Sequence, residues 1–258
     1  MRDRLDVNAV WLKQLRALVD KDHHGLAPRG LSLRAELLAS QTVIDMRLAT
    51  FSILERALSR RFMFGEAWWI LSGSDRVESI SPFCKHIARF SDDGDIFFGA
   101  YGPKIKAQLP YVLDKLFDDV SSRQCVINVW RESPPLTKDV PCTLSIQFLV
   151  RGGALHLVVA MRSSDIWLGF PYDVFNFTAL AFYVSLLLRE NGIMVDLGNL
   201  YLTAGSQHLY ESDADNAERL LLAVAEAPPS STIFAFADRF LPKETFVSTL
   251  YAIATSKL

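Results

Sequence analysis

The stretch DVPCTLSIQFLV (139–150), followed by MRSSDIWLGFPYDVFNFTAL (161–180), decides the fold of this chain. Cys142 follows a proline, which cannot continue a central strand, and it precedes a run of alternating apolar residues. The pattern therefore predicts a strand that carries a thiol at its mouth, where a substrate can reach it. A cysteine met alone in such a place would instead be read as a buried, inert residue.

The residues after this strand favour the reactive interpretation of Cys142. Arg162 and Ser163 supply a guanidinium fork and a hydroxyl, which are groups that hold a phosphate monoester. A cation close to a cysteine also favours its thiolate form. An anionic substrate bound at these residues would help to position its own attack. The alternative for Arg162 is a surface salt bridge.

Composition sets looser bounds on the protein. A chain of 258 residues with 50% hydrophobic content can bury the core of one large domain, and we expect a single domain over residues 1–258. The net charge of -2, with basic residues spread along the chain, predicts neither a nucleic-acid nor a membrane surface. Cys84, Cys125 and Cys142 fit neither a disulfide framework nor a zinc site, so a reducing cytoplasm is the expected location.

Targeting and membrane segments are not expected. The first residues are charged and amphipathic, unlike a signal peptide. The most apolar run, ALAFYVSLLL (179–188), ends at Arg189, so no stretch is expected to be long and charge-free enough to span a bilayer.

The order of predicted elements indicates an α+β fold around one mixed sheet. The periodicities predict helices over residues 10–19, 51–71, 107–120 and 174–190, and strands over residues 125–130, 142–150, 154–161 and 193–210. The last fifth of the chain is predicted to hold a helix, a break, a short apolar strand and a terminal helix.

Six motifs, in order, resemble those of the thymidylate synthase family. They are GEAWWILSGSD (65–75), GAYGPKI (99–105), SSRQCVINVW (121–130), VPCTLSIQFLV (140–150), MRSSDIWLGFPYD (161–173) and GSQHLYESD (205–213). A weaker match, APRG (27–30), is similar to the phosphate loop near the family's N-terminus. The resemblance implies the family's fold, a curved mixed sheet flanked by helices.

The resemblance also implies a reaction. Cys142 would add to C6 of a pyrimidine nucleoside monophosphate, so that C5 takes a one-carbon unit from 5,10-methylenetetrahydrofolate. The active unit would be a homodimer in which Arg123 serves the partner's site. The phosphate would be bound by Arg29, Gln124, Arg162 and Ser163, and the sugar by His208 and Tyr210. Gln147 would line the nucleotide pocket, and Tyr101 would lie near the nucleophile. The folate would contact Asp165 and the shielding position Ile87, and Glu66 would order the reacting water.

Structural interpretations stand beside these roles. Arg123 could form a surface salt bridge, and His208 could be a hydrogen-bonded histidine of the core. Glu66 resists such an interpretation, because burying a lone carboxylate in a Trp-rich helix costs several kcal/mol unless it is paired or protonated.

Asp173 departs from the family's pattern at the position that would contact the pyrimidine base of the nucleotide. The thymidylate enzymes carry Asn after Gly-x-Pro-Phe, and an amide meets the N3–H donor and the O4 acceptor of uracil. An ionised Asp173 would instead accept from the two donors of an N3-protonated cytosine. The family's cytidylate 5-hydroxymethylases carry Asp at this position, so the chain most resembles that branch, and the resemblance implies a cytidine monophosphate as substrate. The alternative is an aspartate that caps the following helix.

Further departures bear on the fate of the one-carbon unit. Thr143 replaces the family's His, Ile87 stands where a shielding Trp is usual, and the ending STLYAIATSKL (248–258) lacks the family's closing tail. Hydride transfer from the folate needs a closed, dry site, so an altered lid favours quenching by water and a hydroxymethyl product.

Three hypotheses remain. The first is a folate-dependent hydroxymethylase of dCMP, or of CMP; Ser163 favours the deoxyribose, whereas Gln124, in place of a second arginine, is uninformative. The second is a reductive relative that makes 5-methyl-dCMP, or dTMP from dUMP. The third is a nucleotide-binding protein without chemistry, which the intact Cys142, Glu66, Arg162 and His208 disfavour.

Overall fold

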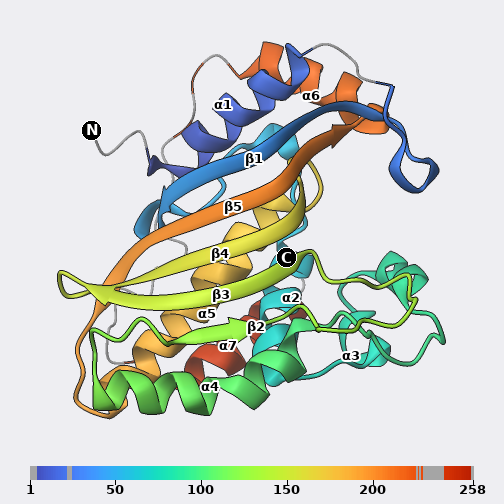
Figure 1. Cartoon of the computed structure of the whole chain (residues 1–258). Coiled ribbons are helices and arrows are strands. Elements are labelled where there is room, and N and C mark those ends of the chain that lie inside the picture. Colours follow the sequence, from blue (N-terminus) through green and yellow to red (C-terminus); the bar gives the residue numbers. More distant parts are fainter. Residues whose placement is uncertain (1–4, 22–24, 225, 227, 229–240, 257–258) are drawn as a thin grey trace.

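Five strands form one mixed sheet in the order β1-β5-β4-β3-β2 (Figure 1). The computed structural model describes residues 5–21, 25–224, 226, 228 and 241–256. The strands are β1 (Leu33–Asp45), β2 (Val126–Asn128), β3 (Thr143–Arg151), β4 (Ala154–Asp165) and β5 (Asp196–Tyr210). Together with the helices around them they make the α+β class that the sequence predicts.

The parallel pair β4–β5 positions the site. The other neighbouring pairs are antiparallel, but β4 returns to β5 through the long helix α5 (Phe170–Glu190). Because parallel strands end at the same edge of a sheet, the ends of β4 and β5 lie side by side, and Asp165 is in register with His208.

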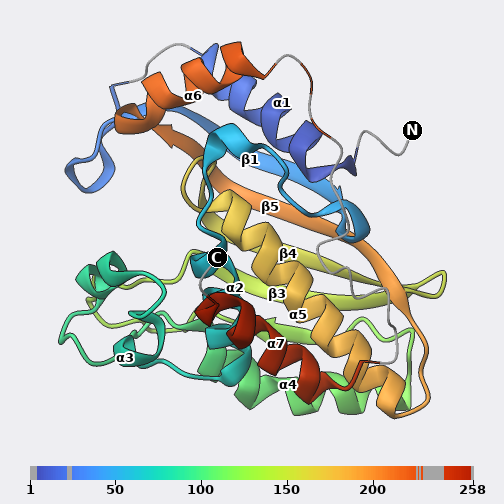
Figure 2. The ribbon, with the colours of Figure 1, turned by 180° about the vertical axis from the view of Figure 1, so that it is seen from behind.

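Most helices lie on one face of the sheet, as the view from behind shows (Figure 2). Helix α5 crosses this face, with α2 (Arg60–Ser72), α4 (Tyr101–Asp118) and α7 (Lys243–Thr255) beside it. Helices α1 (Val7–Val19) and α6 (Glu211–Ala223) pack together next to β1. The short helices are α3 (Val77–Ile80), η2 (Pro28–Gly30), η3 (Met46–Leu48), η4 (Leu54–Arg56) and η5 (Lys85–Phe90).

The core lies between the sheet and α5. Alternate residues of β4, such as Leu157 and Val159, are completely buried, as the period of two predicts. Helix α1 is joined to this core by buried Trp11, whose Nε1 donates a hydrogen bond of 2.7 Å to the carbonyl of Ile166. This bond fixes the turn between β4 and α5.

Some predicted boundaries were wrong. The helix expected over 51–71 begins at Arg60, because the Ser59 side chain accepts a hydrogen bond from the Phe62 N–H and caps the helix there. The helix expected from 174 begins at Phe170, with Pro171 in its first turn. The short apolar strand expected near the C-terminus lies outside the described residues.

Helix α5 has the length and composition of a bilayer-spanning helix, although we expected no such stretch. Of its most apolar window, 78% is buried inside the protein. The helix therefore has the surroundings of a core helix, and Arg189 lies in its last turn.

Candidate active site

Cys142 lies directly before β3, partly exposed, beside the guanidinium of Arg162 on β4. The Arg162 Nη2 is 3.7 Å from the Cys142 Sγ. The same guanidinium donates to the carbonyls of Pro141, at 3.0 Å, and Val140, at 2.9 Å. Arg162 thus holds the loop that carries the thiol and places a positive charge next to it.

Tyr101 and Thr143 form the next layer of the site. The phenol oxygen of Tyr101, at the start of α4, accepts hydrogen bonds from the Thr143 N–H at 3.2 Å and the Thr143 hydroxyl at 3.0 Å. Burial raises the pKa of Tyr101 well above its usual value, and the charges of Asp173 and Cys142 add to this. The phenol therefore stays protonated between the nucleophile and Asp173.

Asp173 does not cap α5. Gly169 occupies the N-cap position, and no side chain caps this end of the helix. Burial raises the pKa of Asp173 well above its usual value, and the charges of Glu66 and Asp165 raise it further. Because no described cation offsets this, the site favours protonated Asp173 rather than the ionised form that we expected.

Glu66 on α2 faces Asn176 on α5. The Asn176 Nδ2 donates a hydrogen bond of 2.8 Å to the Glu66 Oε2. Burial raises the pKa of Glu66 to about 7, and the amide of Asn176 opposes that rise. Glu66 can therefore give and take a proton near neutral pH. Asn176 was missed in the sequence, although a polar residue three positions after Asp173 in an apolar helix is a usable signal.

Asp165 and His208 lie across the β4–β5 register. The Asp165 Oδ1 accepts from the N–H groups of Trp167, at 2.8 Å, and Leu168, at 2.9 Å, which shapes the turn into α5. Burial raises the pKa of Asp165, and the charge of His208 opposes this. The His208 ring meets the Tyr210 ring edge-on, with 4.9 Å between centroids.

Two further predicted residues, Ser163 and Ile87, make no side-chain hydrogen bond within the described cluster. Ser163 directly follows Arg162 on β4 and is in register with Ser206 of β5. Ile87 lies on η5, partly buried against the hydrophobic core.

Other predicted residues are not brought to this cluster. Arg123 and Gln124 are exposed in the loop before β2. The Gln147 Nε2 donates to the Arg123 carbonyl at 2.8 Å, and Gln147 is five residues along β3 from Cys142, roughly 16 Å at the usual rise per residue. Gln147 therefore lies away from the Cys142 cluster, where β3 pairs with the edge strand β2. Arg29 lies on η2, but its side chain is outside the described part of the structure.

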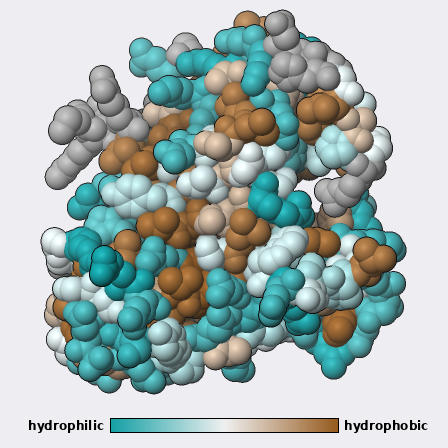
Figure 3. Space-filling view, in the orientation of Figure 1, coloured by the Kyte–Doolittle hydropathy of each residue, from teal (hydrophilic) through white to brown (hydrophobic). Residues whose placement is uncertain are grey.

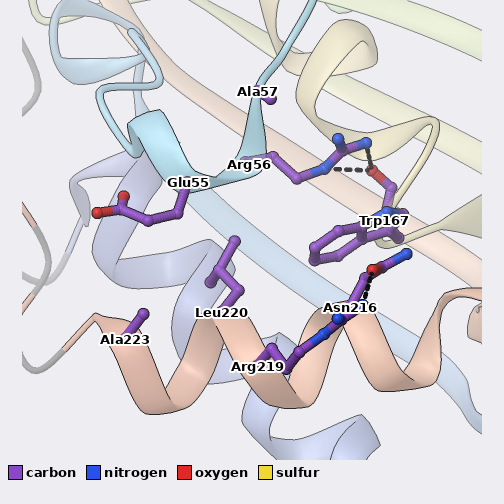
Figure 4. A pocket seen from close by; sticks show the side chains of 8 residues that line it. All are labelled: Glu55, Arg56, Ala57, Trp167, Asn216, Arg219, Leu220 and Ala223. Carbon is purple, nitrogen blue, oxygen red and sulfur yellow. Dashed lines mark hydrogen bonds between the residues drawn. The ribbon is translucent and has the colours of Figure 1, made fainter.

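A hollow of about 460 Å³ lies beside the Asp165 turn (Figure 4). Trp167 lines it together with Arg56 of η4 and Arg219 of α6. The Arg56 guanidinium lies 4.4 Å from the centroid of the Trp167 ring and donates to the Trp167 carbonyl at 2.7 and 3.2 Å. An indole and two guanidinium groups suit a flat molecule with an anionic end.

Comparisons with known proteins identify two phage relatives of this chain. The protein is 30% identical over 220 residues to a deoxyuridylate hydroxymethyltransferase of Bacillus phage SP01, covering 76% of this chain and 55% of the relative. It is 30% identical over 167 residues to a deoxyuridylate hydroxymethyltransferase of Pseudomonas phage M6, covering 61% of this chain and 46% of the relative. The chain thus spans about half the length of these curated relatives.

The family model described as thymidylate synthase matches residues 11–240. That span contains every strand of the described residues and the cluster around Cys142. The chain therefore belongs to the thymidylate synthase family.

Proposed function

We propose that this protein is a folate-dependent 5-hydroxymethyltransferase of a pyrimidine deoxynucleoside monophosphate, with dCMP as substrate. The observation that carries the proposal is the Cys142 thiol, 3.7 Å from the Arg162 guanidinium. Glu66 has a pKa of about 7, which suits a general base. It belongs to the same site, because its charge adds to burial in raising the pKa of Asp173.

The nucleotide would be held at both of its polar ends. Arg162 and Ser163 would bind the 5′-phosphate, aided by Arg29 and by the partner subunit's Arg123 and Gln124. The guanidinium of Arg162 is preorganised for this role, because two backbone carbonyls already fix its position. His208 and Tyr210 would hold the sugar, at the end of β5.

The chemistry would begin when the Cys142 thiolate attacks C6 of the base. Electron density then moves toward C5 and toward N3 and the substituent at C4, and a protonated Asp173 can deliver its proton there. Tyr101 would donate its O–H beside the same atoms. The activated C5 would take the one-carbon unit that 5,10-methylenetetrahydrofolate supplies.

The site has groups that fit a folate. Asp165 keeps a carboxylate oxygen for the paired N–H donors of a pterin, since only its Oδ1 is used in the turn. Ile87 would pack against the ring system. The hollow with Arg56 and Arg219 would receive the anionic glutamate end.

A second candidate substrate is dUMP, which the printed names of the two phage relatives favour. A protonated Asp173 carries a donor and an acceptor, so it can pair with O4 and N3–H of uracil as well as with N3 and N4 of cytosine. CMP differs from dCMP only at the sugar. A reductive transfer, which would leave a methyl group at C5, is the alternative outcome.

The deciding experiment is mass spectrometry of the nucleotide product. The protein would be incubated with 5,10-methylenetetrahydrofolate and, in separate reactions, dCMP, CMP and dUMP. We expect a hydroxymethyl product from dCMP. A methyl product would replace the hydroxymethyl proposal with the reductive one, and no product from any nucleotide would remove the enzyme proposal.

The open face of the sheet supports the proposed homodimer. None of the described helices covers the face seen in Figure 1, and Figure 3 shows hydrophobic side chains gathered across its middle. Leu149, Val158 and Tyr201 alternate with buried residues on β3, β4 and β5; the first two are only partly buried, and Tyr201 is exposed. A second copy of the chain would cover them and bring Arg123 toward the other site.

The dimer makes a complementation prediction. Arg123→Ala and Cys142→Ala chains should each be inactive, yet an equal mixture should recover about a quarter of wild-type activity, because half of the dimers would contain one intact site. Subunit exchange would be verified by native mass spectrometry. If exchanged dimers stay inactive, Arg123 acts within its own chain or is structural.

A further inference from the structure

Asn176 is the one described side chain that donates a hydrogen bond to Glu66, and its surroundings are unusual for an amide. It is 8% exposed and stands among apolar residues of α5. Its Oδ1 is buried and accepts no hydrogen bond within the described part of the chain. A buried carbonyl without a partner is costly, and a native protein retains one for a reason.

The direction of the amide supplies that reason. Nδ2 faces Glu66, so the bond favours the ionised carboxylate, which is an acceptor only. Only Oε2 takes part, which leaves Oε1 for another partner. An apolar residue of the same volume would fill the space without an unpaired oxygen, yet it would give Glu66 no donor.

The other titratable groups around Glu66 do not stabilise its ionised form. Besides burial, the charge of Glu66 raises the pKa of Asp173 and of Tyr172 on α5, and the charge of Asp173 raises the pKa of Tyr101 on α4. Cys84 and Arg56 act on Tyr172. Asp173 is itself held in its protonated form, and no described lysine or arginine offsets either carboxylate. Asn176 therefore supplies the donor that opposes burial.

We propose that Asn176 is a positioning residue that holds Glu66 in its ionised form, with Oε1 directed to the water that ends the reaction, at a cost in folding stability. This inference rests on the proposed hydroxymethyl transfer. It assigns to α5 a second role in the site besides the placement of Asp173.

The step that depends on this geometry is the quenching of the intermediate. The base is then bound through C6 to Cys142 and carries an exocyclic methylene at C5. The water oxygen forms a bond to the methylene carbon, Glu66 takes the water proton, and the π pair moves into the ring. That pair then re-forms the C5–C6 double bond and expels the Cys142 thiolate. The hydroxyl group on the product and the proton on Glu66 together come from one water molecule.

Asn176→Leu separates this role from a structural one. Because it replaces the amide by an apolar group of similar volume, we expect a melting temperature equal to or above the wild type's, within about 3 °C. The kcat should fall about tenfold with KM within about threefold, since ground-state contacts remain. The rise of kcat with pH, which follows ionisation of Glu66, should move upward by about one unit, because the lost donor had lowered the pKa of Glu66.

A readout free of folate comes from carbon-13 NMR of the glutamate carboxylates, with Glu66 assigned by Glu66→Gln. Its titration should move upward in Asn176→Leu and stay unchanged in the control Asn191→Ala, an exposed asparagine at the other end of α5. Added thiol competes with water for the methylene, so the ratio of thioether to hydroxymethyl product should rise about tenfold in Asn176→Leu.

The outcomes are distinct. An unmoved Glu66 titration, or equal falls of both products with an unmoved pH profile, would overturn the role of Asn176. A wild-type protein that makes no hydroxymethyl product would overturn the proposed function and the water step with it. The NMR titration would still decide whether Asn176 holds Glu66.

Discussion

Cys142→Ala is expected to abolish product formation, with a loss of at least about 10³-fold, because no other described thiol lies at this site and the attack on C6 has no substitute. Release of tritium from C5-labelled nucleotide should disappear with it, since C5 becomes reactive only after the attack. Nucleotide affinity should stay within about threefold, because charged contacts to the phosphate dominate binding. Turnover, tritium release and equilibrium binding would be measured on the same preparation.

The matched control is Cys84→Ala. Cys84 is likewise a partly exposed cysteine outside any disulfide, but it lies directly before η5, and none of the described hydrogen bonds of Arg162 involves it. It should retain wild-type turnover. Near-normal turnover in Cys142→Ala would contradict covalent catalysis, whereas an equal loss in both variants would point to general damage by removal of a thiol.

The sheet was largely predictable, because the alternation along β3 and β4 shows directly in the sequence. Phe148 and Leu157 are buried where a period of two places them. The parallel pairing of β4 with β5 follows from the helix between them. The start of α2 at Arg60 depended on one capping side chain, Ser59, which the apolar periodicity of the preceding residues concealed.

The candidate site was predictable in its members more than in its electrostatics. The motifs identified Cys142, Arg162 and Glu66, and the structure places them within one cluster or its immediate neighbours. The protonation of Asp173 could not be predicted, because it depends first on burial and then on two carboxylates, Glu66 and Asp165, that come near only in the folded chain.

Gln147 shows a different limit. Its motif position suggested the nucleotide pocket, but its neighbour Phe148 faces the core, so Gln147 points to the other face of β3. The period of two could have indicated this. The hydrogen bond to the Arg123 carbonyl could not have been read from the sequence, since it joins residues 24 positions apart.

The raised pKa of Asp173 sharpens the question of the base. An acid that holds its proton can form two hydrogen bonds with either cytosine or uracil, so pairing alone does not choose between them. What differs is proton transfer. Attack at C6 of cytosine needs a full proton at N3, which a carboxylic acid can deliver and an amide cannot. Uracil needs only a hydrogen bond to O4, and an amide supplies that.

Asp173→Asn should therefore lower kcat/KM for dCMP by at least about tenfold, or about 1.4 kcal/mol of transition-state stabilisation, and should raise the relative use of dUMP. The two substrates would be compared on one enzyme preparation, so that the ratio of their kcat/KM values cancels partial unfolding. Because Gly169 holds the N-cap position, the substitution leaves the start of α5 intact. If the variant loses both substrates equally, the proton of Asp173 does not select cytosine. If the wild type already prefers dUMP, the substrate is the deoxyuridylate named for the phage relatives.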